Sequence, residues 1–522
     1  MGSQFEFRFL IEMDSTTLYK FVGKLLNDKE FAVLATNADR VAYAMDRVLA
    51  HDVTTKVVKT NLDKARMKTR KSRSRAEEYL EKAELYMKEK RFDDAMKTVH
   101  KAIVHVPVDE VNLRVKLYAV KSNIHTAKRE GRQALYAIQM AASIKDQLQM
   151  DLVLLQLNCL IPMRRFGSAI ELIDRVLDQE DSFWEGQEFP KSSFERVKRA
   201  LQEDGNTENF TRDPSEERAK HRQYFGHQMD KRCKIVSSPV VGRHFVATED
   251  IPANTVLLAE RPYSLWLLTG ALQRKCSYCY HDLEHKLYPC HHCTEVAFCN
   301  ENCFNAAWAS YHRFECGIIT LLNSLTGPAA HAFRIMSRIG PFQASQLEET
   351  QSSYYIEQYI ADTEQRDVPE REKTQEEKNR QYQIAASLCD HNDKHSRQTN
   401  AYHTVLAIVV TILLELVNGL HLEQDRFRHF AELVIIGMRR IVFNVFGWHE
   451  FEHTSSNRNY VANCQCLVGS LINHSCVPNT TWEWRDGIIR FVSNVAIAKG
   501  SQITITYGPN DQMSYTKRQD HM

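Results

Sequence analysis

The sequence predicts an α+β protein of several domains, in which a helical N-terminal part precedes a β-rich part that carries a small inserted metal-binding module. Three observations predict this class. The first part of the chain has helical periodicity with a repeating motif, and strand patterns begin at Cys233 and return from Tyr460. Between these strand regions, four pairs of potential metal ligands lie within Cys276–Cys316. A length of 522 residues allows about three domains.

The composition is that of a soluble globular protein, with 43% hydrophobic and 25% charged residues. A net charge of +1 argues against a global attraction to nucleic acid or membranes. The N-terminus has acids within its apolar stretch and no basic region, so it does not read as a signal peptide. The apolar run Val405–Leu414 is too short to span a bilayer, and we interpret it as a buried helix. No membrane association is expected.

Residues 1–74 are predicted to form a helical extension with a basic linker. The stretch 56–75 holds nine Lys or Arg residues and one acid, Asp63. Its segment KTRKSRSR (68–75) has the composition of a nuclear-import or nucleic-acid patch. A solvated helix or linker explains the same residues, and we favour it.

Residues 75–180 contain an internal repeat. The segment RFDDAMKTVHKAI (91–103) is echoed by RFGSAIELIDRVL (165–177), with GRQALYAIQMAASI (131–144) between them. The aligned alanines are 39 and 35 residues apart: Ala95, Ala134 and Ala169. This pattern resembles tetratricopeptide (TPR) repeats, which implies three stacked helical hairpins in an arc separate from the β-rich core, with a face that binds peptides. A plain helical bundle is the alternative.

The remaining boundaries follow from changes in pattern. Polar residues 181–230 read as a linker with helices, and the charged stretch 364–381 reads as a surface loop. Strands are expected on both sides of a turn at Ile251–Asn254. After the linker, we predict a first strand region at 231–275, the metal module at 276–316 and a helical insert at 317–440. A second strand region at 441–510 and a short tail at 511–522 follow.

The metal-binding module is the most specific signal in the sequence. Its ligands read Cys276-x2-Cys279, Cys290-x2-Cys293, Cys299-x3-Cys303 and His312-x3-Cys316. Zinc takes four N or S ligands, so eight ligands in four pairs predict two zinc ions. Buried cysteines clustered by chance would not pair at fixed offsets. A disulfide knot fits poorly with a long charged chain that lacks a secretory signal.

This spacing resembles a MYND zinc finger, in which the pairs interleave. The resemblance assigns one zinc to Cys276, Cys279, Cys299 and Cys303, and the other to Cys290, Cys293, His312 and Cys316. We interpret Trp308 and Tyr311 as packing residues over the metal. His291 and His292 are expected to be exposed rather than to displace a ligand.

A second constellation lies near the C-terminus. The motif Asn473-His474-Ser475-Cys476 is followed about thirty residues later by Tyr507-Gly508. Together with the split strand regions and the inserted finger, these motifs resemble a SET domain. The order of parts is that of the SMYD family of lysine methyltransferases, and the repeats point to its branch with an N-terminal TPR extension. Cys464 and Cys466 read as small buried residues on a strand.

The resemblance implies methyl transfer from S-adenosylmethionine (SAM) to a lysine of a protein substrate. It makes Tyr507 the catalytic residue, placed where methyl and amine meet. The implied cofactor-binding residues are Gly242, Arg243, His244, Asn444, Asn473, His474 and Tyr507. The family pattern has two glycines around one residue in this loop, whereas this chain has Gly242 alone. For Asn444, a helix cap explains the residue as well as a cofactor contact does.

One departure concerns the end of the sequence. The family pattern continues into a cysteine-rich post-SET segment, but no cysteine follows Cys476 here. We therefore expect a truncated chain or one that has given up part of its site. In the family pattern, the post-SET segment forms one wall of the lysine channel. Without this segment the channel admits water, so weak SAM binding and slow methylation are expected.

The alternative to an enzyme is a non-catalytic adaptor, in which TPR-like and MYND surfaces recruit peptides or proteins and the SET fold is scaffold. Sequence-specific DNA binding is not expected, because only 56–75 is basic. Thirteen cysteines, seven of them predicted zinc ligands, fit a reducing compartment, so cytoplasm and nucleus are expected.

Overall fold

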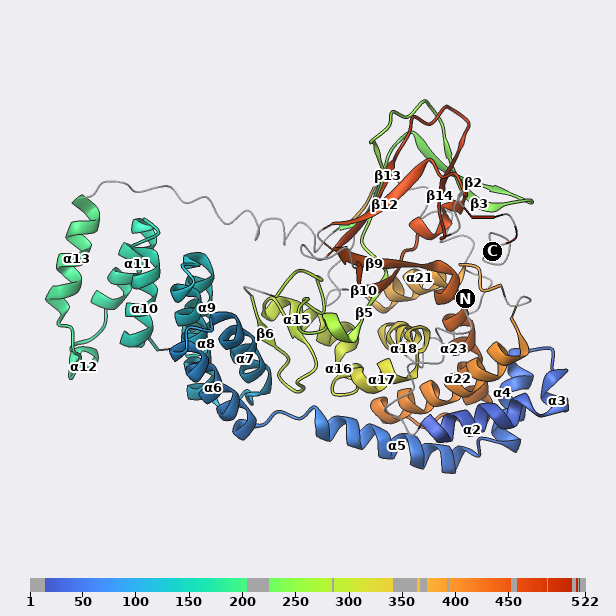
Figure 1. Cartoon of the computed structure of the whole chain (residues 1–522), viewed down its shortest axis with the longest axis horizontal. Helices are drawn as coiled ribbons and strands as arrows, with labels where there is room; N and C mark the ends of the chain where they lie inside the picture. The colour runs from blue at the N-terminus through green and yellow to red at the C-terminus, as the bar shows by residue number, and fades with distance from the viewer. Residues whose placement is uncertain are drawn as a thin grey trace.

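The computed structural model describes residues 15–145, 147–203, 225–283, 286–340, 364–366, 373–391, 395–451, 458–485, 487–508, 513–514 and 516. It shows a helical array on one side, the finger in the middle, and the β-rich part above a layer of long helices (Figure 1). The predicted tail beyond residue 510 lies almost entirely outside the described residues.

The predicted hairpin repeats are present. They are the helix pairs α6 (Arg73–Lys88) with α7 (Phe92–His105), α8 (Val111–Ala127) with α9 (Gly131–Ser143), and α10 (Met150–Leu160) with α11 (Phe166–Leu177). The aligned alanines are fully buried where neighbouring helices meet: Ala95, Ala134 and Ala169. A small residue at this point lets two helices approach closely, which is why the sequence echo predicted the hairpins.

The array continues beyond its predicted end at residue 180. Helix α12 (Asp181–Trp184) leads to α13 (Lys191–Glu203), which packs on α11 and buries Phe194 and Leu201. These residues therefore belong to the array rather than to a linker. Strand β1 (Phe225–Met229) already belongs to the sheets, and the rest of the predicted linker lies outside the described residues.

The N-terminal residues differ from the expected extension and linker. They form α2 (Ser15–Leu26), α3 (Lys29–Ala32), α4 (Asn37–Arg47) and α5 (His51–Lys68), which pack on the long helices α22 (Arg397–Asn418) and α23 (Gln424–Asn444) (Figure 1). Arg397 donates to the Asp28 carbonyl and Arg428 to the Asp46 carboxylate. The basic stretch 56–75 is thus mostly the helix α5 together with the start of α6.

Helix α22 contains the apolar run that we predicted to be a core helix. By length and composition it could cross a membrane, but 78% of its apolar window is buried inside the fold. The N-terminal helices provide part of that cover. Removing residues 15–68 would therefore expose a core surface, and the N-terminal helices cannot be separated from the β-rich part as a free module.

Apart from a two-stranded sheet within the finger, the strands of the described residues form three sheets. The largest has the order β12-β13-β4-β1-β8, another β5-β10-β9, and a third β11-β14-β3-β2. The bounds of the strands not yet given are β2 Cys233–Ser238, β3 Gly242–Ala247, β4 Val256–Glu260, β5 Ser264–Leu267, β8 Glu364–Arg366, β9 Val445–Phe451, β10 Arg458–Gln465, β11 Asn473–His474, β12 Thr480–Arg485, β13 Ile488–Ser493 and β14 Gln502–Ile505. In the third sheet, β11 runs parallel to β14, which pairs with β3. This sheet brings two distant motifs of the sequence together.

The helical insert comprises α17 (Ile319–Leu325), α18 (Gly327–Ile339), α21 (Gln375–Ala386), α22 and α23. Helix α21 corrects the prediction of a surface loop over 364–381. A capping box starts this helix, in which the Thr374 hydroxyl accepts from the Glu377 N–H and the Glu377 carboxylate accepts from the Thr374 N–H. Residues 367–372 lie outside the described residues.

Candidate metal centres and active site

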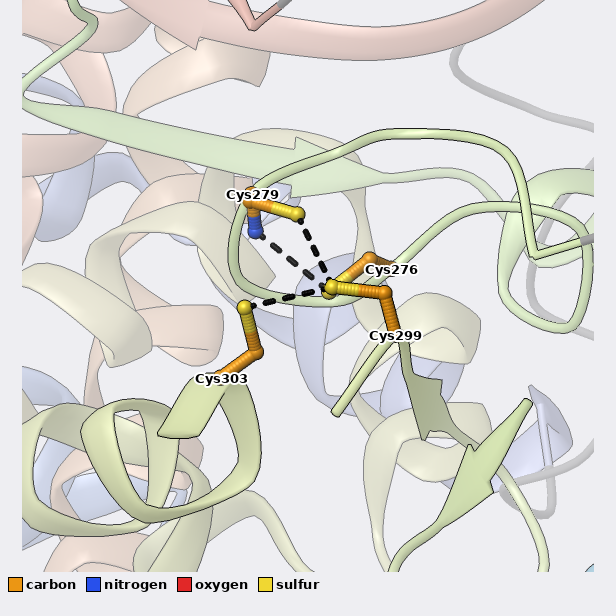
Figure 2. A group of neighbouring side chains, drawn as sticks. All are labelled: Cys276, Cys279, Cys299 and Cys303. Atoms are coloured by element: carbon orange, nitrogen blue, oxygen red, sulfur yellow. Dashed lines mark hydrogen bonds between the residues drawn. The ribbon is translucent and has the colours of Figure 1, made fainter. Parts of the chain in front are cut away.

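The eight predicted ligands lie in the two predicted interleaved groups. Within each group the ligand atoms lie within 4.8 Å of one another. Figure 2 shows the sulfur atoms of Cys276, Cys279, Cys299 and Cys303 converging, with 3.5 Å between Cys279 and Cys299. The loop ligands Cys276 and Cys279 thus meet Cys303 on α15 (Glu301–Ala307), because β6 (Tyr288–Pro289) and β7 (Ala297–Phe298) fold the finger back on itself.

The second group pairs Cys290 and Cys293 with His312 and Cys316. His312 Nε2 lies 3.2 Å from Cys290 Sγ, and the sulfurs of Cys290 and Cys316 are 3.8 Å apart. A tetrahedral zinc with bonds of about 2.3 Å places its sulfur ligands about 3.8 Å apart. The four ligands are also mostly buried. Donor type, spacing and burial therefore fit one zinc ion in each group.

The aromatic residues of the finger pack as predicted. Tyr311 is buried and donates to the Ser277 carbonyl at 2.6 Å, while Trp308 stacks on His292 with ring centroids 4.5 Å apart. His292 is exposed, whereas His291 is half-buried against Phe304. The Nε2 atom of His291 is hydrogen-bonded to the Tyr288 hydroxyl. Neither histidine belongs to a ligand group.

The predicted active-site residues meet at the junction of β11 and β14. The Tyr507 N–H donates to His474 Nδ1 at 2.9 Å, and the two rings lie 5.4 Å apart. Because Nδ1 accepts, the proton of neutral His474 is on Nε2, which faces Cys476 Sγ at 3.2 Å. Burial lowers the pKa of His474, which favours this neutral form.

Tyr507 is half-exposed, and its hydroxyl donates to the Ile472 carbonyl at 2.8 Å. Burial of the hydroxyl raises the pKa of Tyr507 to about 12, so the phenol stays protonated at neutral pH. Asn473 donates its amide to the Val241 carbonyl. This bond holds the loop before β3 against β11, and the loop turns at Gly242, whose φ of +67° favours glycine.

The other predicted cofactor residues have side chains engaged within the protein. Arg243 donates to the hydroxyl and carbonyl of Ser387 at the end of α21. His244 bonds to the Gly242 carbonyl. Asn444 ends α23 and donates to the carbonyls of Arg440 and Cys389. Asn444 is thus the last residue of the helix rather than its cap, which is Val445, and its amide ties α23 to the loop after α21.

That loop contains residues that the sequence did not reveal. A cavity of about 580 Å³ is lined by Ala35, Arg40, Cys389, Asp390, His391, His395 and Asn400. The side-chain amide of Asn444 donates to the carbonyl of Cys389 in the cavity wall. The carbonyl of Asn444 accepts from the hydroxyl of Ser470, which lies three residues before Asn473 in sequence. The cavity is thus linked to Asn444 through its Cys389 wall, and another part of its wall comes from Ala35 and Arg40 in the N-terminal part. No motif marked this loop.

Two buried cysteines were also predicted correctly. Cys464 and Cys466 are 1% and 0% exposed. Beside them, the buried Glu260 carboxylate accepts bonds from the backbone N–H groups of Leu467, Val468 and Gly469. Burial raises the pKa of Glu260 to about 7 although these donors oppose the rise. This cradle fixes the segment that leads into β11.

Comparison with known proteins agrees with this geometry. A family model described as the SET domain matches residues 242–508, about half of the chain. The chain is 25% identical over 353 residues to mouse protein-lysine N-methyltransferase SMYD4, covering 55% of this chain and 44% of that protein. The human SMYD4 protein is 23% identical over 465 residues, with 72% and 56% covered.

A SET and MYND domain-containing protein of Dictyostelium discoideum is 23% identical over 299 residues, which cover 52% of this chain and 54% of that protein. The chain thus spans about half the length of the curated relatives it matches. The matched SET region encloses both ligand groups, as in a domain with an inserted finger. The chain therefore belongs to the SET-domain family, within its SMYD branch.

Proposed function

We propose that the chain is a SAM-dependent protein-lysine N-methyltransferase whose finger holds two zinc ions. The observation that carries this proposal is the cluster of Asn473, His474 and Tyr507, which two separate motifs form at one sheet junction. The names of the mouse and human relatives support the reaction class. When bound, SAM supplies an electrophilic methyl group on its sulfonium.

The residues of this chain bind and orient the reactants. Tyr507 presents a protonated phenol at the site, held by its own N–H bond to His474. Asn473 fixes the Gly242 turn, whose backbone leaves room for a ligand because it has no side chain. The cavity of about 580 Å³ beside Asn444 has the size of a small-molecule site. We assign the adenosyl portion of SAM to this cavity, where Asp390 and His391 are among the residues that would hold it.

The acceptor lysine must be neutral to react, although its ordinary pKa is near 10.4. Apolar surroundings lower that pKa because they disfavour the ammonium. Exposed apolar side chains adjoin the site residues in sequence: Val241, Phe443 and Val477 are 45%, 40% and 71% exposed. We propose that a protein substrate covers these side chains when its lysine enters, which removes water from the amine.

A methyltransferase assay tests this proposal. Zinc-loaded protein, tritiated SAM and a cell-protein extract should give labelled lysine. Tyr507→Phe should keep SAM binding and lower turnover at least tenfold, because the phenol acts on the reacting groups. The control is Tyr460→Phe, a partly exposed tyrosine of β10 outside the site. Equal turnover of wild type and Tyr507→Phe would contradict the assignment.

The adaptor function remains the second candidate, because one observation favours it. The array and the finger form a continuous surface, joined by the bonds from Tyr118 to the Leu287 carbonyl and from Tyr136 to the Cys299 carbonyl. Such a surface can bind a partner without catalysis. A chain with two zinc ions and no SAM binding would favour the adaptor.

A further inference from the structure

The segment Thr69–Lys71, between α5 and α6, lies against the second ligand group of the finger. The Thr69 carbonyl accepts from the Thr294 N–H at 3.0 Å, and the Thr69 hydroxyl donates to the Gly317 carbonyl at 3.1 Å. Thr294 and Gly317 directly follow the ligands Cys293 and Cys316 in sequence. Arg70 adds a backbone bridge to Cys293 itself. The segment therefore contacts both ligand loops of this centre.

Lys71 brings a positive charge to the same place. Its ammonium donates to the Val104 carbonyl of α7 at 2.8 Å, and the residue is half-buried. The thiols of Cys290, Cys293 and Cys316 lie within its electrostatic reach. Three thiolates outweigh the charge of one zinc ion, so the loaded centre carries a net negative charge. A half-buried cation that bonds to the array and lies near this negative charge is stabilised by it.

The array holds the finger at two further points. The Tyr118 hydroxyl donates to the Leu287 carbonyl at 2.8 Å, and the Tyr136 hydroxyl donates to the Cys299 carbonyl at 3.0 Å. Lys286 also lies over the Tyr136 ring, 5.3 Å from its centroid. The two accepting carbonyls, of Leu287 and Cys299, belong to finger loops that zinc binding would close. Because such loops take their fold from the metal, these bonds need a loaded finger.

We propose that Lys71 is the counter-cation of the second zinc centre, and that the segment Thr69–Lys71 couples zinc loading there to docking of the helical array on the finger. The inference rests on the proposed zinc occupancy. It gives the basic run KTRKSRSR an internal role, since Thr69 bonds to the Gly317 carbonyl beside the finger and Lys71 bonds to the Val104 carbonyl of the array. Loss of this zinc should loosen the docking of α6–α9 on the finger, although the bond from Tyr136 reaches Cys299 of the other centre.

The test compares Lys71→Met, which keeps the length and removes the charge, with Lys59→Met as the control. Lys59 is exposed on α5, away from the finger. Zinc content is measured first, and then the rate of zinc transfer to a chromogenic chelator. Hydrogen exchange of amides in α6–α9 reports docking independently of activity. A value near zero zinc in the wild type would refute the proposed zinc sites rather than the coupling.

With two zinc ions in the wild type, Lys71→Met should release one of them about tenfold faster and lose protection in α6–α9. Lys59→Met should behave as the wild type in both measurements. Lys71→Arg keeps the charge and should retain slow release, which covers the case in which Lys71→Met does not fold. Unchanged release and protection in Lys71→Met, or release from Lys71→Arg as fast as from Lys71→Met, would overturn the coupling.

Discussion

The buried ion pair between Arg334 and Glu315 should be the strongest polar link between the finger and the helical insert. Arg334 on α18 donates to both oxygens of Glu315, at 2.7 and 2.5 Å, and Glu315 directly precedes the ligand Cys316. The two side chains are 6% and 0% exposed. Arg334 also donates to the Leu265 carbonyl and lies over the rings of Trp266 and Tyr311. Burial alone would lower the pKa of Arg334, but Glu315 raises it, so the guanidinium stays charged.

The structure sets the size of the expected effects. Arg334→Met leaves the Glu315 carboxylate buried without its cation, which should cost about 3–5 kcal/mol of unfolding free energy. Glu315→Leu leaves Arg334 uncompensated and should cost a similar amount. The double variant removes both charges and leaves chiefly the Leu265 carbonyl unsatisfied, at about 1–3 kcal/mol. The coupling energy between the two sites should therefore be at least about 3 kcal/mol.

Urea unfolding of the four proteins measures this coupling, followed by tryptophan fluorescence because buried Trp266 lies against Arg334. Zinc content is determined for each variant, so that metal loss is separated from the loss of the ion pair. Arg338→Met, on the same helix and over Tyr263, is the control for removing a helix arginine. If the losses of the two single variants add within about 0.5 kcal/mol in the double variant, the pair is not coupled and the reasoning fails.

Three further outcomes are expected. Glu260 has a folded pKa near 7, above its ordinary value of 4.5, so the folded state binds the carboxyl proton more tightly than the unfolded state does. The free energy of unfolding should therefore fall by about 3 kcal/mol as pH rises from 4.5 to 7. Urea unfolding at several pH values should show a flatter profile for Glu260→Gln than for the wild type, and parallel profiles would contradict this. Purified protein should contain two zinc ions by elemental analysis, and Cys279→Ser should lose one of them; a value near zero or three refutes the ligand groups. Deleting residues 1–68 should yield aggregated protein because α22 loses its cover, whereas a soluble monomer would mean that this packing is dispensable.

The parts of the fold that the sequence predicted are those with local rules. The finger was predictable because zinc geometry fixes the spacing of cysteines within each pair. The hairpins were predictable because buried alanines such as Ala95 and Ala169 recur at the repeat length. The burial of Cys464 and Cys466 followed from their alternation on a predicted strand, which ends at Gln465, one residue before Cys466. In each case, nearby residues carry the information.

The parts that could not be predicted depend on contacts between distant residues. The contact of Arg428 with Asp46 joins positions that no periodicity relates, so the N-terminal helices looked like an independent extension. Lys71 looked like part of a solvated basic run because its partners in the finger lie far along the chain. Helix α21 was missed because its charged residues hid it, although Thr374 and Glu377 have the spacing of a capping box. The cavity loop at Cys389–His391 had no motif at all.

Binding of SAM to the zinc-loaded chain, measured by titration calorimetry beside His474→Ala, tests the central claim most directly. His474 accepts the Tyr507 N–H bond, so its loss should disorganise the site while leaving the finger intact. The account predicts saturable binding of one SAM per chain to the wild type and none to the variant, with two zinc ions in both. No binding to the folded wild type, or equal binding to both proteins, would contradict the claim that this chain is a SAM-dependent methyltransferase.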